Sequence, residues 1–221
     1  QSSWFLLGEI LRRLDPAGAT SEFDDILRRR LLKPLDMHDT TCGLNAEAAK
    51  NMADQLPAAY ERDKGQLVES RYGHVPWITQ PSPGASLRGP VRELGRFYEM
   101  MQRGGQSETG EQLVATATID QMTLRHRGGE YDQTLQHTVD FGLGVVCNSN
   151  KYGVETVPYG FGQHSSDATF GHGGAQCSIG FSDPERRLVV AWSANGFCGE
   201  GLHQRRNRII NDAIYVDLGL T

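Results

Sequence analysis

The sequence predicts an α+β fold in which helices pack on an antiparallel sheet. Two observations carry this prediction. Residues 1–135 combine apolar side chains at helical spacing with loop-forming stretches, whereas residues 136–221 begin with strand-like patterns and end in one further helix. A chain of 221 residues is long enough to form one domain with its own core. We therefore expect residues 1–221 to form a single domain, with a helical and loop part followed by a sheet and a C-terminal helix.

Apolar spacing and turn residues predict the helices of the first part. Residues 1–14 carry apolar side chains at helical spacing, mixed with charged ones, which is typical of an amphipathic helix. A second helix is expected between Ser21 and Pro34, because its first turn is acidic, its last turn is basic and proline stops it. A third helix is expected from Pro90 to the glycines that begin at Gly104. Its expected buried face consists of Val91, Leu94, Phe97, Tyr98 and Met101.

The second part is predicted to contain a β-hairpin at residues 176–193. The stretch 183–186, Asp-Pro-Glu-Arg, is typical of a turn, and if it forms the whole loop, Ser182 lies opposite Arg187. One face of the hairpin is then bulky and apolar while the other is small and uncharged, which predicts a sheet covered on both sides. The bulky face comprises Cys177, Ile179, Phe181, Leu188, Val190 and Trp192. The final helix, 204–218, is expected to bury Ile209, Ile210, Ala213 and Ile214.

Composition argues against several classes of partner. The net charge of −5 gives no electrostatic case for binding nucleic acid, and no apolar run is long enough to span a bilayer. The four cysteines contain no Cys-x-x-Cys pair, so neither a metal site nor a disulfide framework is indicated. We expect no metal and no cofactor.

One histidine lies in an unusual setting. His172 stands between Gly171 and Gly173, immediately before the predicted hairpin, where neighbouring side chains cannot shield it. Taken alone, such a residue is better explained as a loop histidine that bonds to the backbone than as part of a functional site. A second histidine, His164, lies close by in the sequence. It is either a further residue of the same site or, as the sequence alone favours, a loop residue.

Five segments occur in the same order as the motifs of a known family. They are "SSWFLLGEILRRL", "LLKPLDMHDTTCGL", "ASLRGPVRELGRFYEMMQRGG", "FGLGVV" and "FGHGGAQCSIGFSDPERRLVVAWSANG". The last segment resembles the Lys/His-x-Gly motif and following strands of serine β-lactamase-like hydrolases, which include class C β-lactamases, esterases and D-alanyl-D-alanine peptidases. The others resemble the helix after that family's Tyr-x-Asn motif and three of its structural segments. The resemblance covers nearly the whole chain and implies the β-lactamase/transpeptidase-like fold.

The resemblance implies roles for a small set of residues. His172 would line the substrate cleft as a catalytic residue, and the backbone N–H of Ala175 would be one oxyanion donor. Gln1 aligns with the asparagine of Tyr-x-Asn. Because histidine is mostly neutral near pH 7, it is a weaker anchor than lysine for the carboxylate of a penicillin-type substrate, which favours esters. The expected substrate-binding residues are Gln1, His164, Gly173, Gly174 and Gln176.

The nucleophile of that family is missing from this sequence. The family's Ser-x-x-Lys motif needs an amine one helical turn after the hydroxyl, and none of the chain's 13 serines has lysine three residues later. We therefore expect the chain to be the C-terminal part of a longer protein, without the N-terminal strands that complete the family's sheet. An open sheet edge is prone to pair with a second copy, so a homodimer is an expected partner state.

The sequence thus leaves two functions open. The first is part of a serine hydrolase that forms an acyl-enzyme on esters, amides or β-lactams, with this chain inactive by itself. The second is a family member that has lost catalysis and serves as a binding or scaffold module. The resemblance implies a bacterial protein exported to the periplasm or the medium, although the residues themselves do not fix the compartment.

Overall fold

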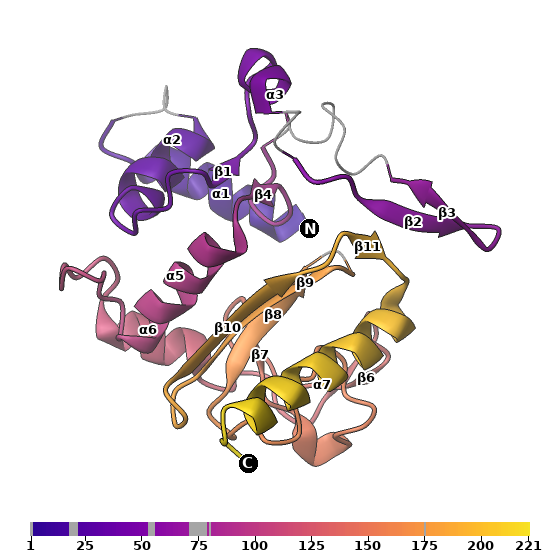
Figure 1. Ribbon diagram of the computed structural model, residues 1–221. Helices are drawn as coiled ribbons and strands as arrows, with labels where there is room; N and C mark the ends of the chain where they lie inside the picture. The colour runs from indigo at the N-terminus through magenta and orange to yellow at the C-terminus, as the bar shows by residue number, and fades with distance from the viewer. Residues whose placement is uncertain (1, 18–21, 53–55, 71–78, 80, 175) are drawn as a thin grey trace. The chain divides into compact units, whose positions relative to one another are not determined.

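The computed structural model describes residues 2–17, 22–52, 56–70, 79, 81–174 and 176–221 (Figure 1). The chain forms two compact units, Gln1–Glu93 and Leu94–Thr221. Helices and short strands occupy the first part of the chain, and a run of strands between residues 131 and 197 precedes the last helix. The strand pairs whose register is defined are antiparallel. This arrangement confirms the predicted α+β fold class.

The first unit contains the predicted helices and short strands. Its elements are α1 Ser2–Leu14, α2 Phe23–Leu27 with the continuous π-helical turn η1 Arg28–Leu32, β1 Thr41–Cys42, α3 Ala46–Met52, β2 Tyr60–Asp63, β3 Gln66–Glu69 and β4 Leu87–Arg88. The buried carboxylate of Asp15 joins the end of α1 to η1, because it accepts from Arg29 at 2.6 Å and from Arg30 at 3.0 Å. The basic last turn that the sequence shows is therefore used for an ion-pair contact between helices.

The third predicted helix is α5, Val91–Gln102, which begins in the first unit. Tyr98 and Met101 are buried as expected, but Val91 is 43% exposed, so that part of the predicted buried face is wrong. Glu93 is buried in its place. Its carboxylate accepts from the Thr40 hydroxyl at 2.5 Å and from a backbone N–H at 3.1 Å, which offsets the cost of burying a charge.

The second unit is built around a four-stranded sheet. Its elements after α5 are α6 Thr116–Thr123, β5 Tyr131–Asp132, β6 His137–Thr138, β7 Val146–Cys147, the 3₁₀ turn η4 Asn150–Tyr152, β8 Phe170–Gly174, β9 Ser178–Asp183, β10 Leu188–Ser193, β11 Gly196–Phe197 and α7 Glu200–Asp217. The strand order of this sheet is β10-β9-β8-β7. Figure 1 shows α7 lying along one face of it.

The predicted hairpin is present as β9 and β10, with a different register. Val189, not Arg187, lies opposite Ser182, so the predicted pairing is wrong by two residues. The loop has the expected four residues but lies one position later, at 184–187, because Asp183 pairs with Leu188. Arg187, with a left-handed φ of 51°, belongs to the turn. A shift of two residues leaves every side chain on its predicted face.

Both faces of the hairpin are covered, as predicted. The bulky face enters a core cluster that includes Ile179, Phe181, Val190 and Tyr215 of α7. On the other face, Gly180 leaves room for the Tyr98 ring of α5, because a Cβ at that position would meet the ring at 2.4 Å. The sheet is therefore enclosed between α7 and α5.

The buried face of α7 differs from the prediction. Ile209 is 59% exposed and Ala213 is also exposed, so the prediction is wrong at these two positions, whereas Ile210 and Ile214 are half-buried and Ile214 packs against the core cluster. Four polar side chains, four residues apart, are buried instead: His203, Asn207, Asn211 and Tyr215. Oδ1 of Asn207 has no partner among the described residues, but other polar atoms of this face form hydrogen bonds. The Trp192 indole N–H donates to Asn211 at 3.0 Å, for example.

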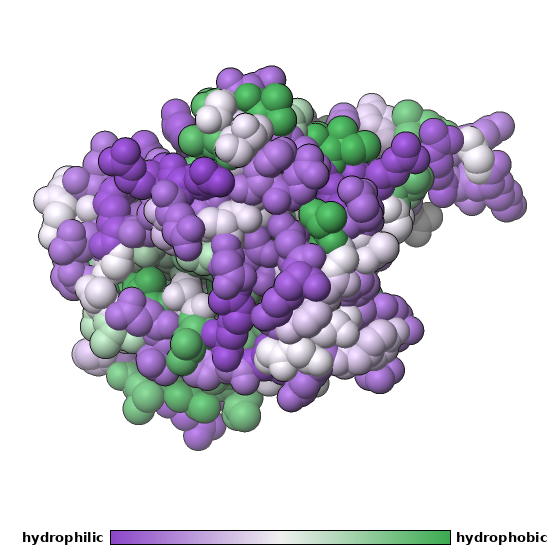
Figure 2. All heavy atoms as spheres, turned by 90° about the horizontal axis from the view of Figure 1, so that it is seen from below, coloured by the Kyte–Doolittle hydropathy of each residue, from purple (hydrophilic) through white to green (hydrophobic). Residues whose placement is uncertain are grey.

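The exposed surface is mostly polar. Figure 2 shows a largely hydrophilic face on which hydrophobic side chains gather in separate groups. No helix among the described residues is both long enough and apolar enough to cross a membrane.

Candidate functional site

Close packing explains the glycines around His172. A Cβ on Gly171 would lie 2.3 Å from the backbone oxygen of Gly180 on β9, and a Cβ on Gly173 would lie 2.1 Å from the ring of Tyr159. The strand β8 therefore lies directly against its neighbours at both positions. Its pairs with β7 reach only as far as Gly171, so among the described residues 172–174 have no strand partner on that side.

The His172 ring is exposed and has a fixed hydrogen bond. Its Nδ1 lies 2.6 Å from the backbone oxygen of Gly173. A carbonyl oxygen only accepts, so Nδ1 carries the proton in the neutral ring and Nε2 carries the lone pair. The arrangement presents a proton acceptor at Nε2.

Helix α5 supports the backbone of His172 from one face of the sheet. The buried Tyr98 hydroxyl hydrogen bonds with the backbone of His172, and burial raises the pKa of that hydroxyl. The strand residue opposite His172 is Gly180, which is the position that lets the Tyr98 ring approach. The helix thus fixes the strand at the residue that carries the candidate catalytic ring.

Tyr159 supports the ring itself. Its centroid lies 5.6 Å from that of His172 and 6.4 Å from that of the buried His203 on α7. The Tyr159 backbone has a left-handed φ of 51° and its N–H donates to the side chain of Gln204. Sequence reasoning missed Tyr159, because a single aromatic residue in a loop carries no periodic signal.

A tight turn follows β8. Cys177 N–H donates to the Gly174 oxygen at 3.0 Å, and Gln176 takes a left-handed φ of 61°. The Gln176 carbonyl accepts from Arg206 of α7 at 2.8 Å, and its side-chain oxygen accepts from the N–H of Gly199 at 3.1 Å. The side chain predicted to contact substrate is therefore engaged within the protein.

The other predicted site residues are placed differently. Gly173 and Gly174 lie beside His172 in β8. Ala175 and Gln1 fall outside the described residues. His164 contacts the neighbouring Gln163 at 3.2 Å, and no hydrogen bond or ring contact among the described residues joins it to His172.

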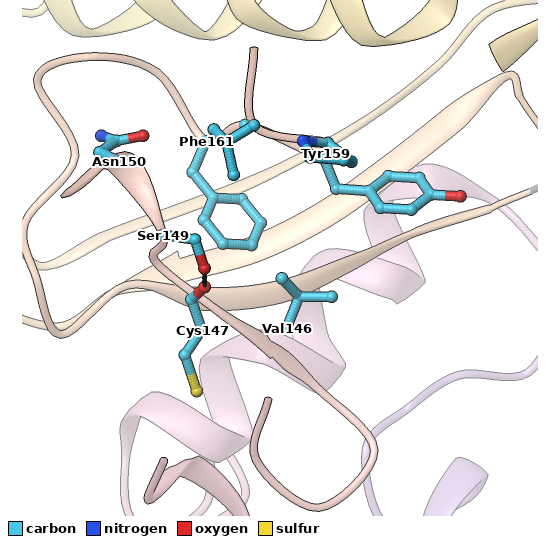
Figure 3. A pocket seen from close by; sticks show the side chains of 9 residues that line it. Val146, Cys147, Ser149, Asn150, Tyr159 and Phe161 are labelled. Atoms are coloured by element: carbon cyan, nitrogen blue, oxygen red, sulfur yellow. Dashed lines mark hydrogen bonds between the residues drawn. The ribbon is translucent and has the colours of Figure 1, made fainter. Parts of the chain in front are cut away.

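A small pocket is lined by residues of β7 and of the loop around Tyr159 (Figure 3). It encloses about 160 Å³, below the roughly 300–1,000 Å³ typical of ligand sites. Ser149 lines it but is buried and donates to the Cys147 carbonyl at 2.9 Å, as the dashed line in Figure 3 shows. The Tyr159 ring points away from Phe161 in this view. We therefore regard this pocket as a packing feature.

In the described part of the chain, no group of three or more histidine, cysteine, aspartate or glutamate side chains could hold a metal ion.

The family model named Beta-lactamase matches residues 2–214.

The chain belongs to the Beta-lactamase family.

Solved structures of this fold agree with that assignment. EstCE1, a hydrolase with promiscuous acyltransferase activity, superposes with a TM-score of 0.71 at 19% identity, over 95% of this chain and 54% of its own. A penicillin-binding protein homologue from Caulobacter crescentus superposes with a TM-score of 0.65 at 22% identity, over 93% of this chain and 55% of its own. A β-lactamase from Mycobacterium bovis superposes with a TM-score of 0.63 at 16% identity, over 98% of this chain and 62% of its own. No curated protein matches the sequence significantly.

These likenesses establish the fold, since each identity is below 25%. The chain spans a little over half the length of the EstCE1 and Caulobacter structures. As a member of the Beta-lactamase family, it carries its His-Gly-Gly segment on β8 with the ring exposed.

Proposed function

We propose that this chain supplies the His172-Gly173-Gly174 strand of a serine hydrolase that acts through an acyl-enzyme, with esters as the favoured substrates. The observation that carries the proposal is the hydrogen bond from Nδ1 to the Gly173 oxygen, which leaves Nε2 as a proton acceptor. An acceptor suits proton transfer in acyl transfer and does not suit an anchor for a substrate carboxylate. Membership of the Beta-lactamase family and the likeness to EstCE1 and to a family VIII carboxylesterase support an ester.

The nucleophile in this proposal lies outside residues 1–221, because no serine of the chain is followed by lysine at the third position. In this proposal the backbone N–H of Ala175 serves as one oxyanion donor, and Gly173 and Gly174 border the substrate. Residues 172–174 of β8 have no partner strand on the β7 side among the described residues, so that side of the strand is open to such a contact.

The isolated chain is expected to hydrolyse neither nitrocefin nor p-nitrophenyl acetate above a heat-treated sample, because it lacks a nucleophile. A longer protein whose upstream sequence contains Ser-x-x-Lys should react with a fluorophosphonate probe and turn over p-nitrophenyl esters.

In that longer protein, His172→Ala is expected to lower kcat/KM by about 10²–10⁴-fold, the usual range for a proton-transfer group. His126→Ala, which changes an exposed histidine bonded to the Gln121 oxygen, is the matched control. Turnover by the isolated chain, or an unchanged His172→Ala protein, would contradict the proposal.

The second candidate is a family member without catalysis that acts as a binding or scaffold module. The absence of Ser-x-x-Lys from all 13 serines favours it. The two candidates separate in one experiment. A longer protein that contains no Ser-x-x-Lys, or that forms no fluorophosphonate adduct, is the scaffold.

The open edge of β10 is the expected contact with a second copy. Ala194 N–H donates to Cys177 at 2.7 Å, so by strand alternation the even-numbered residues of β10 bond to β9. The N–H groups of Val189 and Ala191 then point outward, and no strand among the described residues covers them. The strand reads Leu-Val-Val-Ala-Trp-Ser, without a charge to deter pairing.

We expect the isolated chain to form a dimer that Ala191→Pro converts to a monomer. Proline removes an outward N–H and leaves the bonds to β9 in place, which is how edge strands tolerate it. Light scattering after size exclusion measures the mass, and Ala191→Val, which keeps the N–H, serves as the control. A monomeric wild-type chain, or a dimer that survives Ala191→Pro, would rule out this edge.

A further inference from the structure

Arg206 on α7 gathers three backbone and side-chain acceptors. Its guanidinium donates to the Gln176 oxygen at 2.8 Å, to the Gly196 oxygen at 3.3 Å and to Nδ1 of His203 at 3.1 Å. Its planar face lies 5.7 Å from the centroid of the Trp192 ring. All three contacts come from one terminal nitrogen, Nη2, while Nε is buried without a partner among the described residues.

His203 completes the contact one helical turn earlier. The ring is fully buried, and its Nδ1 accepts from Arg206, so the neutral ring carries its proton on Nε2. It also hydrogen bonds with the backbone of Ser178, the first residue of β9. Two side chains of α7 therefore hold the turn between β8 and β9 at Gln176 and at Ser178.

That turn needs such support. Gln176 has a left-handed φ of 61°, a conformation that is unfavourable for a residue with a side chain. Without the hydrogen bond from Arg206, the backbone at Gln176 is free to leave this left-handed conformation. The turn begins at Gly174, next to Gly173, whose carbonyl fixes the proton on the His172 ring.

A second route joins α7 to the same ring. His203 packs edge-on against Tyr159, with centroids 6.4 Å apart and planes at 74°. Tyr159 in turn packs on His172 and occupies the space beside Gly173. The His172 ring and the carbonyl that it bonds are thus reached from α7 through both the turn and Tyr159.

We propose that Arg206 and His203 are positioning residues that hold His172 as the Nδ1–H tautomer, with Nε2 free to accept a proton. They act through the Gln176 turn and Tyr159 and do not touch the substrate. The inference rests on the proposed function only for its purpose, since the tautomer is a property of this chain and is measurable without turnover.

The test measures histidine ring nitrogens by long-range ¹H–¹⁵N NMR on the full chain, with His172 assigned by its loss in His172→Gln. The wild-type protein is expected to show His172 as a single Nδ1–H tautomer. Arg206→Met, which keeps the length and removes the donors, is expected to convert this pattern to averaged shifts of two tautomers. Arg205→Met changes an exposed arginine next to it and is expected to leave the pattern intact.

Arg206→Lys separates positioning from folding. It keeps the charge and one donor direction, so we expect a folded protein with a partial shift toward mixed tautomers. An unchanged His172 pattern in folded Arg206→Met would overturn the inference. Loss of folding in both Arg206 variants would also overturn it, because Arg206 would then be a determinant of folding. Failure of the proposed function shows separately, as unchanged activity of His172→Ala in the longer protein.

Discussion

Asp183→Ala is expected to lower the free energy of unfolding by about 3–5 kcal/mol, the range for large losses at buried networks. The Asp183 side chain is fully buried at the start of the hairpin turn. It accepts from the Ser166 hydroxyl at 2.6 Å, the Ser166 N–H at 2.9 Å, the Tyr215 hydroxyl at 2.7 Å and the Arg186 N–H at 3.2 Å. Alanine leaves these donors without an acceptor in the interior, where an unmade hydrogen bond is costly.

Urea unfolding followed by circular dichroism measures the loss. Asp217→Ala, at an exposed position of α7, is the control and is expected to change stability by less than about 0.5 kcal/mol. Tyr215→Phe removes one of the donors and is expected to cost about 1 kcal/mol. Equal midpoints for Asp183→Ala and Asp217→Ala would refute the structural role.

The same residue has a pH signature. Burial raises the pKa of Asp183, but the hydrogen bonds from Ser166, Tyr215 and Arg186 outweigh it, so the net pKa is lowered. A carboxylate with a lowered folded pKa stabilises the protein above its unfolded value, near 3.8, and the stabilisation is lost as the pH falls further.

The second large effect is a loss of stability in mild acid caused by His203. Burial, with a contribution from the charge of Arg206, lowers the pKa of His203 to about 4 from an ordinary value of 6.5. Between these two pKa values, His203 is therefore protonated in the unfolded chain and neutral in the folded chain. Stability from this group is complete above pH 6.5 and falls as the pH drops from 6.5 toward about 4, by up to about 3 kcal/mol.

Urea midpoints between pH 4 and pH 8 measure this slope. His203→Phe is expected to flatten it, because a phenyl ring keeps the packing on Tyr159 and Trp192 without a proton to bind. At pH 8 the variant should be less stable than the wild-type protein, because the substitution removes the hydrogen bonds of His203. His126→Gln, at an exposed position, is expected to retain the wild-type slope. A slope that persists in His203→Phe would assign the acid sensitivity to other groups.

Patterns of residue type predicted the elements well and the polar burial poorly. The faces of the β9–β10 hairpin follow from alternation alone, which survives a register error of two residues. The error itself came from Arg187, because a left-handed arginine in a turn carries no sequence signal. On α7, the apolar pattern included Ile209, which is exposed, and missed Asn211 and Tyr215, whose partners lie on other segments of the fold.

The candidate site shows the same division. His172 and its glycines stand out in the sequence, and the family resemblance was readable from five ordered segments. Tyr159 and Arg206 did not stand out, because their roles depend on contacts with residues 14 and 30 positions away along the chain. No local spacing encodes such contacts.

The sequence by itself determined the α+β class, the family, the position of the exposed histidine and the lack of a Ser-x-x-Lys nucleophile within these residues. Each of these depends on residue type and order along the chain. The tertiary structure decided which nitrogen of His172 carries the proton, what occupies the space beside Gly173, and why α7 buries polar side chains. These properties depend on the direction of donors and acceptors in space, which exists only once distant segments have packed.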